Sequence, residues 1–238
     1  MEQIKTLSST ITESLPLSTE QADKLGLYAT LVHKRNQNFN LTGHKSPVEI
    51  INNLIIASIA PVIKLNVPRG TFFADLGTGA GIPGIPLSVF IKESKGILFD
   101  SNHKKIKFVN SASRECEINN VKGISCRIEE EGKNNLYRGV FDWVFSRAMA
   151  DIYIACELGA PFLKQGGYLF LYTKDLELAE NPHVQTHISA LGLKLITKTN
   201  NTGRKQNDEG LLFKMEKECP ALFPRRMTAI KRESKKIV

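Results

Sequence analysis

Cysteine is scarce in this chain of 238 residues, and its spacing excludes several kinds of site. No two of the four cysteines form a Cys-x-x-Cys pair, which excludes a zinc ribbon and a thioredoxin-type redox site. His183 and His187 are four residues apart, but no His-Glu-x-x-His motif surrounds them, so we expect no metal site. Because a disulfide framework is also missing, a reducing cytoplasm is the default compartment.

Long apolar runs are missing as well. The most apolar stretch, residues 54–63, contains Ser58 and Pro61, and it falls short of the roughly 20 residues that a helix needs to cross a bilayer. The N-terminal sequence has no apolar segment of the signal-peptide type. Since 42% of the residues are hydrophobic, we expect a globular, soluble, cytoplasmic protein without a membrane partner.

Two common catalytic motifs do not occur. The chain has neither a Gly-x-Ser-x-Gly nucleophile elbow nor a P-loop, which argues against an α/β-hydrolase and against a P-loop nucleotidase.

What the chain does have is an excess of positive charge. It contains 32 Lys and Arg against 24 Asp and Glu, a net charge of +8, which favours a polyanionic partner. Residues 225–236 hold six basic residues and one acidic residue, and so carry five of the eight net charges. We expect a basic tail that is mobile or ordered by RNA, with four candidate RNA-binding cations: Arg225, Arg226, Lys231 and Arg232.

The order of apolar runs predicts an α/β fold. From residue 67 on, runs of about five apolar residues alternate with helical patterns, which is typical of βαβ units and a mostly parallel sheet. About seven strands are expected, near residues 71–75, 96–100, 123–128, 141–146, 167–172, 193–197 and 211–215. The polar segment between the last two predicts a hairpin that makes one edge strand antiparallel.

Three parts follow from this pattern. We expect a helical N-terminal portion over residues 1–66, where Ser18 and Gln21 form a capping box ahead of an apolar stripe. A Rossmann-like domain is expected over residues 67–219, followed by the basic tail, residues 220–238.

The sharpest motif is Asp-Leu-Gly-Thr-Gly-Ala-Gly-Ile-Pro-Gly at residues 75–84, between a predicted strand and a predicted helix. Glycine lets the backbone turn tightly and lets a ligand approach it. Ligands of open α/β sheets bind at the carboxyl ends of the strands, beside such loops. A dinucleotide fingerprint is Gly-x-Gly-x-x-Gly, but Ile82 stands three residues after Gly79 where that fingerprint requires glycine.

The acid before the loop favours a different ligand. A carboxylate at Asp75 suits an ammonium group, such as that of the methionine part of S-adenosylmethionine, better than a pyrophosphate. A tight turn without a ligand and a dinucleotide site remain the alternatives. The loop's candidate cofactor residues are Asp75, Gly77, Gly79, Gly81 and Ile82.

Further candidates follow the neighbouring strands. Asp100 comes 23 residues after Gly77 and could accept the hydroxyls of a ribose, or else begin the next helix as its N-cap. Ile128 could contact an adenine with Glu129 beside it, unless the two belong to a solvated acidic run. Arg147 would face the pocket, the alternative being a surface arginine in a loop.

Together these residues resemble the bacterial 16S ribosomal RNA guanine-N7 methyltransferase family, also called glucose-inhibited division protein B. The similarity covers roughly residues 20–232. It rests on Asn-Phe-Asn-Leu-Thr at 38–42, the run DLGTGAGIPGIPLS, FDSNHKKIKFV at 99–109, Glu129, Ser-Arg-Ala at 146–148, Lys174 and Phe-Pro-Arg-Arg at 223–226.

The resemblance implies a Rossmann-like class I methyltransferase sheet with helices on both faces, S-adenosylmethionine as the cofactor, and 16S ribosomal RNA or a small-subunit assembly as the partner of a monomer. It assigns cofactor contacts to Gly77, Ile82, Ile128, Glu129 and Arg147. Arg147 and Lys174 are the substrate-side candidates. No Asn-Pro-Pro-Tyr segment, usual where an exocyclic adenine nitrogen is the target, occurs at residues 142–149.

Two segments depart from the family pattern. Where the family shows His-x-x-Asp-Ser, this chain has Leu54, Ala57 and Ser58, so the His and the Asp are absent. Of a Gly-x-Pro-x-Lys pattern in the tail, only Lys231 remains. An RNA-binding pseudoenzyme is therefore an alternative hypothesis. An NAD(P)-dependent oxidoreductase is a third, disfavoured by the loop spacing and Asp75.

Overall fold

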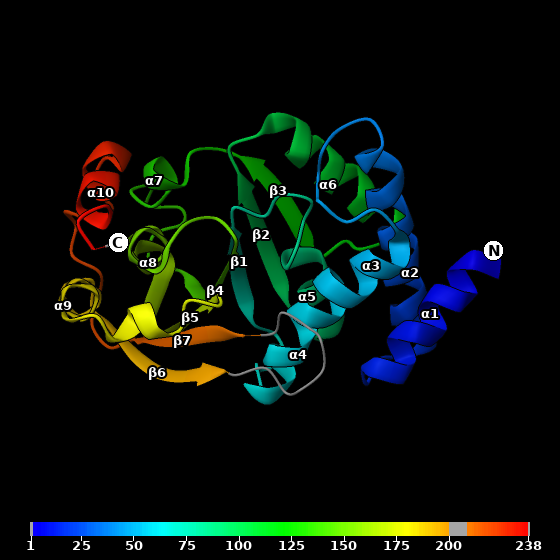
Figure 1. Ribbon diagram of the computed structural model, residues 1–238, viewed down its shortest axis with the longest axis horizontal. Coiled ribbons are helices and arrows are strands. Elements are labelled where there is room, and N and C mark those ends of the chain that lie inside the picture. The colour runs from blue at the N-terminus through cyan, green and yellow to red at the C-terminus, as the bar shows by residue number, and fades with distance from the viewer. Residues whose placement is uncertain (1, 200–208, 238) are drawn as a thin grey trace.

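The computed structural model describes residues 2–199 and 209–237, which form a seven-stranded sheet with helices on both faces (Figure 1). The strand order is β3-β2-β1-β4-β5-β7-β6. All pairs from β3 to β5 are parallel, whereas β7 is antiparallel to both of its neighbours. The strands are β1 (Phe72–Leu76), β2 (Lys95–Asp100), β3 (Val121–Ser125), β4 (Phe141–Arg147), β5 (Leu163–Tyr172), β6 (Leu193–Thr199) and β7 (Gly210–Met215).

β6 and β7 pair antiparallel, as the predicted hairpin requires, while residues 200–208 of the segment between them lie outside the described residues. The edge strand is therefore antiparallel to its neighbour as expected, but the strand that runs against the parallel strands is β7. The antiparallel strand β7 lies between β5 and β6, so β6 forms the edge. The burial of the two strands explains this order. β7 is apolar and almost entirely buried, whereas β6 exposes Lys194 and half-exposes Lys198. Charged side chains on an edge strand oppose pairing with another chain, so β6 suits the edge better.

The N-terminal portion is helical, as expected. It comprises α1 (Glu2–Ser14), α2 (Thr19–Asn36), α3 (Pro47–Ile50), the π-helical turn η1 (Ile51–Ile56) and α4 (Ala57–Lys64). The capping box of Ser18 and Gln21 starts α2. The last three elements make one helical stretch, Pro47–Lys64, that is long and apolar enough to cross a membrane by length and composition. Half of it is buried within the protein, and this core packing accounts for its apolar character.

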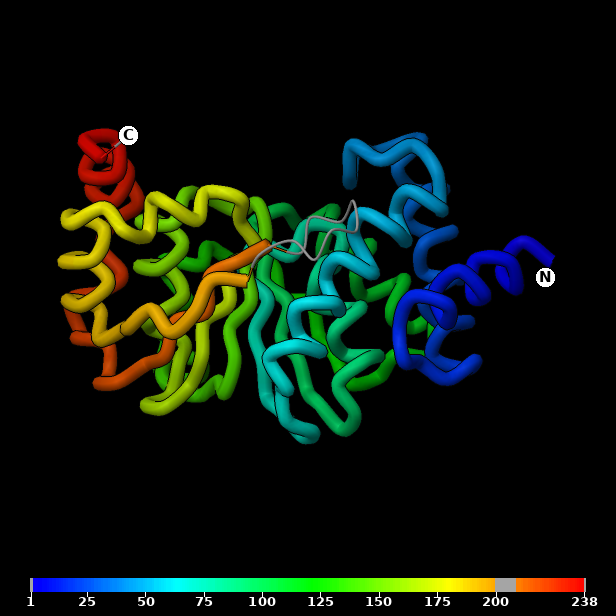
Figure 2. Tube along the Cα trace, turned by 60° about the horizontal axis from the view of Figure 1, so that its bottom comes forward, coloured from blue at the N-terminus to red at the C-terminus, as the bar shows by residue number. Residues whose placement is uncertain are grey.

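Helices lie on both sides of the sheet. Besides the N-terminal ones, they are α5 (Gly84–Phe90), α6 (His103–Glu115), α7 (Ile128–Glu131), α8 (Ile152–Gly159), α9 (Pro182–Ala190) and α10 (Met227–Ser234), with 3-10 turns at Ala160–Phe162 (η2) and Glu177–Glu180 (η3). The N-terminal helices lie with α5 on one side of the sheet, and α8, α9 and α10 lie on the other (Figures 1 and 2).

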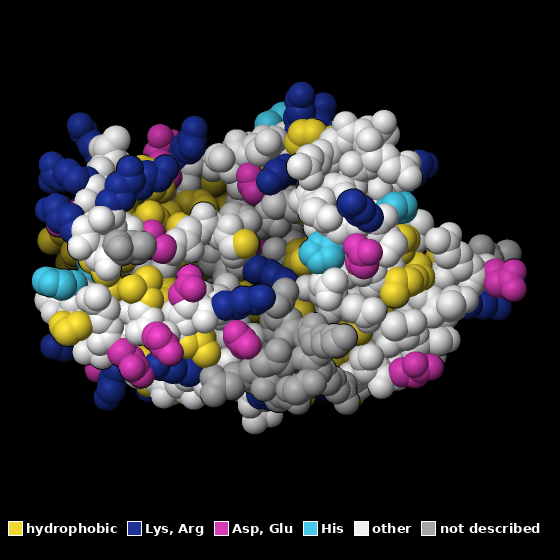
Figure 3. Space-filling view, viewed as in Figure 1, with side chains coloured by type: hydrophobic (Ala, Val, Ile, Leu, Met, Phe, Trp, Pro, Cys, Tyr) yellow, Lys and Arg dark blue, Asp and Glu magenta, His cyan; other side chains and the backbone are white. Residues whose placement is uncertain are grey.

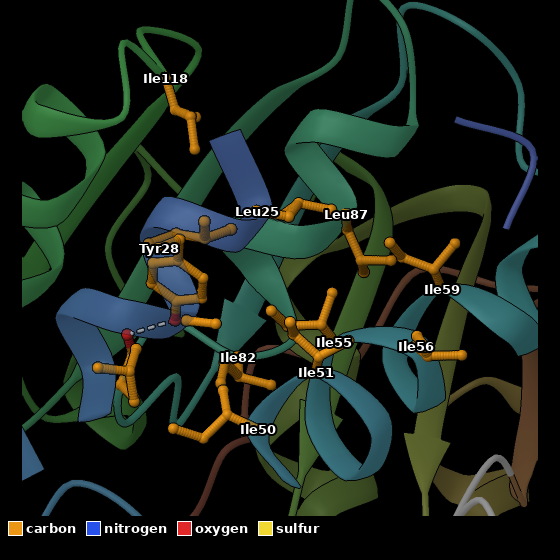
Figure 4. Packing of buried hydrophobic residues seen from close by; sticks show 14 of the residues in the cluster. Leu25, Tyr28, Ile50, Ile51, Ile55, Ile56, Ile59, Ile82, Leu87 and Ile118 are labelled. Atoms are coloured by element: carbon orange, nitrogen blue, oxygen red, sulfur yellow. Dashed lines mark hydrogen bonds between the residues drawn. The ribbon is translucent and has the colours of Figure 1, made fainter. Parts of the chain in front are cut away.

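The N-terminal helices share a core with the sheet. Leu25, Ile51 and Ile55 are fully buried and lie close together (Figure 4). They belong to the same cluster as Phe73 of β1. The Tyr28 hydroxyl donates a 2.8 Å hydrogen bond to the Ala80 carbonyl, which ties α2 to the glycine loop. The position of this loop therefore depends on the N-terminal portion.

The C-terminal segment is an ordered part of the fold, so the expectation of a mobile tail is wrong. α10 packs against α8 through Ile230, which is fully buried. The Ser234 hydroxyl donates a 2.6 Å hydrogen bond to Asp151. Arg138 donates hydrogen bonds to the carbonyls of Cys219, Pro220 and Phe223. These contacts explain the order: the basic run also contains apolar and hydrogen-bonding residues on its inner side.

Candidate functional site

The glycine loop follows β1 at the edge of the sheet where the parallel strands end. Gly77, Gly79 and Gly81 have φ angles of +73°, +59° and +100°, which residues with a Cβ rarely adopt. A Cβ on Gly77 would also lie 2.9 Å from Cγ of Met149. The backbone conformation of this turn therefore requires glycine at these three positions of the motif.

The buried side chain of Asp75 stabilises the glycine loop through hydrogen bonds. Its side chain is fully buried, and Oδ2 accepts hydrogen bonds from the Thr78 hydroxyl at 2.5 Å and the Gly84 N–H at 2.8 Å. Its Oδ1 is buried and has no hydrogen-bond partner among the described residues. Burial raises the pKa of this carboxyl to about 7. Asp75 lines neither of the cavities described below, so its contacts are with the loop and with the start of α5.

Asp100 joins β2 to the glycine loop. Its Oδ2 accepts a hydrogen bond from the Gly79 N–H at 2.9 Å, and its Oδ1 accepts one from the Asn102 N–H at 2.8 Å. The alternative role as a helix N-cap is wrong, because Asn102 caps α6. An ionised carboxylate offers about four acceptor positions, so Asp100 keeps capacity for a bound hydroxyl pair.

A first cavity of about 320 Å³ opens beside this carboxylate. Met227 and Lys231 of α10 contribute to its wall. Four of the predicted cofactor residues also line it: Gly77, Asp100, Ile128 and Glu129. Ile128 differs from expectation in its setting, because β3 ends at Ser125 and Ile128 begins the short helix α7. Sequence alone predicted the strand to run on through this apolar position.

A second cavity of about 210 Å³ is bordered by the glycine loop. Three residues, Gly77, Lys105 and Ala148, line both cavities, so the two spaces are adjacent. The remaining wall comes from the N-terminal portion, the glycine loop and β4: Leu41, Thr42, Leu54, Thr78, Gly79, Ala80, Ile82 and Arg147.

Arg147 is directed toward the π-helical turn. Its guanidinium donates hydrogen bonds to the carbonyls of Asn53 at 2.7 Å and Leu54 at 3.2 Å, and to the Ser58 hydroxyl at 3.2 Å. The expectation that it faces the pocket is met in part, since Arg147 lines the second cavity while its charge is satisfied by carbonyls. Burial lowers its pKa. The alternative of a surface arginine is wrong.

Other candidates lie outside both cavities. Lys174 is exposed in the segment that follows β5. Gly81 lines neither cavity, and a Cβ there would lie 2.7 Å from Cδ1 of Ile85. Arg226 and Arg232 are exposed at the start and along α10. The site therefore brings together most of the cofactor candidates, but only Lys231 from the four basic ones.

Arg225 is bound within the protein. Its guanidinium donates hydrogen bonds to both carboxylate oxygens of Glu157, at 2.6 Å and 2.9 Å, and Glu157 is fully buried. It also donates to the Tyr153 hydroxyl at 3.1 Å. This contradicts the interpretation of Arg225 as an RNA-binding cation. The sequence carried no signal for this pair, because the partners are 68 residues apart.

His187 completes this buried group. Its ring stacks on Tyr153 with centroids 3.7 Å apart, and Nε2 lies 3.3 Å from Glu157. That distance would suit an ion pair. Burial, however, lowers the pKa of His187 to about 4, so the ring is neutral at pH 7 and contributes packing. The group Tyr153, Glu157, His187 and Arg225 fastens the C-terminal segment to α8 and α9.

The comparisons with solved structures show the fold. The chain is similar to an S-adenosylmethionine-dependent methyltransferase from Aquifex aeolicus, with a TM-score of 0.50 at 14% identity over 69% of this chain and 90% of the other. It is also similar to Aeropyrum pernix fibrillarin bound to S-adenosylmethionine, with a TM-score of 0.51 at 13% identity over 66% of this chain and 75% of the other. The expected class I methyltransferase fold is confirmed.

The comparisons with curated sequences show the family. A ribosomal RNA small subunit methyltransferase G from Desulfitobacterium hafniense is 32% identical over 216 residues, which cover 90% of this chain and 89% of the relative. One from Mycoplasmoides gallisepticum is 30% identical over 227 residues, or 92% of each chain. The family described as rRNA small subunit methyltransferase G matches residues 21–207. The chain therefore belongs to the rRNA small subunit methyltransferase G (GidB) family.

Proposed function

We propose that this chain transfers the methyl group of S-adenosylmethionine to N7 of a guanine in 16S ribosomal RNA. The observation that carries the proposal is the pair of cavities that meet at Gly77, inside a chain of this family. The first cavity offers groups suited to an adenosine. The second is bordered by Arg147 and Lys105, cations that suit an RNA substrate.

The residues of the first cavity fit the cofactor. Asp100 keeps acceptor positions for the ribose hydroxyls, and Ile128 offers an apolar surface for the adenine. Because Gly77 has no Cβ, a ligand can approach the backbone closely at this position. When bound, S-adenosylmethionine supplies an electrophilic methyl group on a sulfonium. We assign Gly79 and Glu129 to the same site, with Ile82 and Arg147 at its reaction side.

Methylation at guanine N7 requires little acid–base catalysis by the protein. This nitrogen has a lone pair and no proton, so no general base has to remove one. In accord with this, the described residues that line the second cavity include no acid and no histidine. The protein's part is to place N7 in line with the methyl group, a proximity effect worth up to about 7–11 kcal/mol in the best cases.

The cations beside the second cavity have a positioning role in this scheme. Positive charge develops on the purine during transfer, so a cation at N7 would oppose the reaction. Arg147 and Lys105, which line the second cavity, would instead contact O6 or phosphates. We assign the same role to Lys174, which is exposed outside both cavities. Lys and Arg side chains gather over α10, at the rim of a hollow in the surface (Figure 3). This helix contributes Met227 and Lys231 to the wall of the first cavity. We assign Arg226, Lys231 and Arg232 to RNA phosphates, and we place the protein in the cytoplasm as a monomer.

Methyl transfer itself is the decisive test. The substrates are small ribosomal subunits isolated from cells that lack this chain, and their deproteinised RNA. We expect labelled methyl groups in the RNA, at a guanine that becomes sensitive to aniline cleavage, as N7-methylguanine is. Cofactor binding without transfer to either substrate would support the pseudoenzyme, which the replacement of the family's His and Asp by Leu54 and Ala57 favours. Binding of NAD instead of S-adenosylhomocysteine would support an oxidoreductase.

A further inference from the structure

A groove between α2 and α6 is larger than either cavity of the site, at about 540 Å³. Its walls carry five cations and one acid, a local net charge of +4. The cations are Lys34, Arg35, Lys104, Lys107 and Arg114, and the acid is Glu115. The proposed function so far assigns nothing to this groove.

The cations of the groove are available to a ligand. All five side chains are exposed. Within residues 2–199 and 209–237, none of them forms an ion pair or donates a side-chain hydrogen bond. Arg35 instead lies 5.5 Å from the ring centre of Phe39. A concentration of like charges without counter-charges has a cost in repulsion, which an anionic ligand would remove.

The spacing of these residues forms two facing helical surfaces. On α6 the lining residues recur every three or four positions, from Lys104 through Lys107 to Arg114. On the facing wall the same spacing links Leu31 and Lys34 of α2 to Asn38, which lies two residues beyond the end of that helix. Lys104 and Arg114 are ten helical steps apart, which corresponds to about 15 Å along the axis, so the α6 wall can contact successive phosphates of one strand.

Apolar side chains interrupt the charges. Phe108 and Leu31 line the groove between the cations, and both are partly buried. Proteins that bind single-stranded nucleic acid combine a basic groove along the backbone with aromatic rings on which bases stack. Phe108 and Leu31 also pack against the hydrophobic core, so the parts of these side chains that line the groove are what a base could contact.

Both walls lead to the second cavity. Lys105 lies between Lys104 and Lys107 in the sequence and lines both cavities of the site. From Asn38 on the opposite wall, the chain continues within four residues to Leu41 and Thr42, which also line the second cavity. A strand in the groove would therefore continue toward the place where the target base enters.

We infer that the groove between α2 and α6 binds a single-stranded segment of the substrate RNA that flanks the target guanine; this rests on the proposed function. The cations contact phosphates and so set the register of the strand, while the cavity selects the base. A single strand is expected because a base inside a duplex cannot reach the methyl group.

The test is a triple neutralisation, Lys34→Gln with Lys107→Gln and Arg114→Gln. The matched control removes three exposed lysines outside the groove: Lys92→Gln, Lys95→Gln and Lys217→Gln. Binding of deproteinised small-subunit RNA and of small subunits is measured at several salt concentrations. For a single strand, each lost phosphate contact lowers the salt slope of log affinity by about 0.7, so the groove variant should lose about 2 and bind at least about tenfold more weakly near 0.1 M salt.

Other measurements separate the possible results. S-adenosylhomocysteine affinity should be unchanged in both variants; if the triple variant loses it, the single variants Lys107→Gln and Arg114→Gln are measured, each expected to lower the slope by about 0.7. A groove variant with the control's salt slope would overturn the inference. So would weaker binding of subunits but not of free RNA, which would indicate a protein partner. If the unmodified chain binds RNA through the groove but transfers no methyl group, the proposed function fails and the groove assignment stands.

Discussion

Two adjacent arginines show how much a residue's role depends on its surroundings. Arg225 pairs with a buried carboxylate, whereas Arg226 is exposed. We expect Arg225→Ala to destabilise the fold by about 3 kcal/mol, because it leaves Glu157 buried without its partner. Arg226→Ala should change the free energy of unfolding by less than about 0.5 kcal/mol. Urea unfolding of both variants makes the comparison, and equal stabilities would contradict a structural role for Arg225.

A second prediction concerns the carboxylate of Asp100 in the cofactor site. We expect Asp100→Ala to weaken S-adenosylhomocysteine binding by about 1–3 kcal/mol, the range for losing hydrogen bonds to a charged group. The Gly79 N–H would lose its acceptor as well. Asp100→Asn keeps one side-chain acceptor and should lose less. Calorimetric titration measures both, and an unchanged dissociation constant in Asp100→Ala would remove this carboxylate from the cofactor site.

Sequence predicted the residues of the site where a local motif required them. Gly77, Asp100, Ile128 and Glu129 follow strands that can be read from apolar runs, and all four line the first cavity. Lys105 could not be singled out, because it is one of several lysines at the start of α6 and only the fold directs it to the cavities.

At the scale of elements, α10 changes how RNA binding must be tested. Truncation after Cys219 would expose the surface of α8 that covers Ile230 and would remove the partner of Glu157. We expect this truncated chain to be unstable, so its RNA binding would say nothing about phosphates. Neutralising exposed cations of α10 keeps the helix and isolates their charge.

The third prediction therefore concerns the charge on α10 and at its two caps, Arg226 and Lys235. Arg226→Gln combined with Arg232→Gln and Lys235→Gln should lower the salt slope of RNA binding by about 2 while cofactor affinity and unfolding stay as they were. These three side chains are exposed, and none of them lines the first cavity. An identical salt slope would mean that α10 does not contact RNA.

Some features of the helices and strands could not be predicted from the pattern of apolar residues in the sequence. The strands were predictable because each is an apolar run bounded by turns, but the position of β7 was not, since strand order depends on contacts distant in the sequence. Likewise the π-helical turn Ile51–Ile56 shifts the buried face, so that Ile51 and Ile56 are buried while Leu54 lines the second cavity. The carbonyls of this turn that bind Arg147 follow from the same distortion.

At the scale of the whole molecule, two buried groups link stability to pH in opposite directions. His187 has its pKa lowered to about 4 in the folded protein, against 6.5 ordinarily. The unfolded chain therefore binds the proton first, and the stability due to the neutral ring is lost as pH falls from about 6.5 toward 4. We expect His187→Gln to reduce the loss of stability between pH 7 and pH 5. Urea midpoints at the two pH values test this, and equal losses in both chains would contradict it.

Asp75 acts in the other direction, because its pKa is raised to about 7 from an ordinary 3.8. Between these values the folded chain holds a proton that the unfolded chain has released, so stability falls as pH rises from about 4 to about 7. Each pKa unit corresponds to about 1.4 kcal/mol. Asp75→Asn cannot ionise and keeps an acceptor for Thr78 and Gly84, so relative to it the unmodified chain should lose stability between pH 5 and pH 8.

The measurement is a urea unfolding series on both chains across this range, with His187→Gln as a second reference. The substitution at Asp75 also puts an NH2 group in place of the unpartnered Oδ1, so the variant's stability at any single pH does not decide the matter. The difference between the two stability curves decides it, because the side chain at position 75 can ionise in the unmodified chain and cannot ionise in the variant. Curves that stay parallel from pH 5 to pH 8 would mean that the buried carboxyl titrates at the same pH in the folded and the unfolded chain.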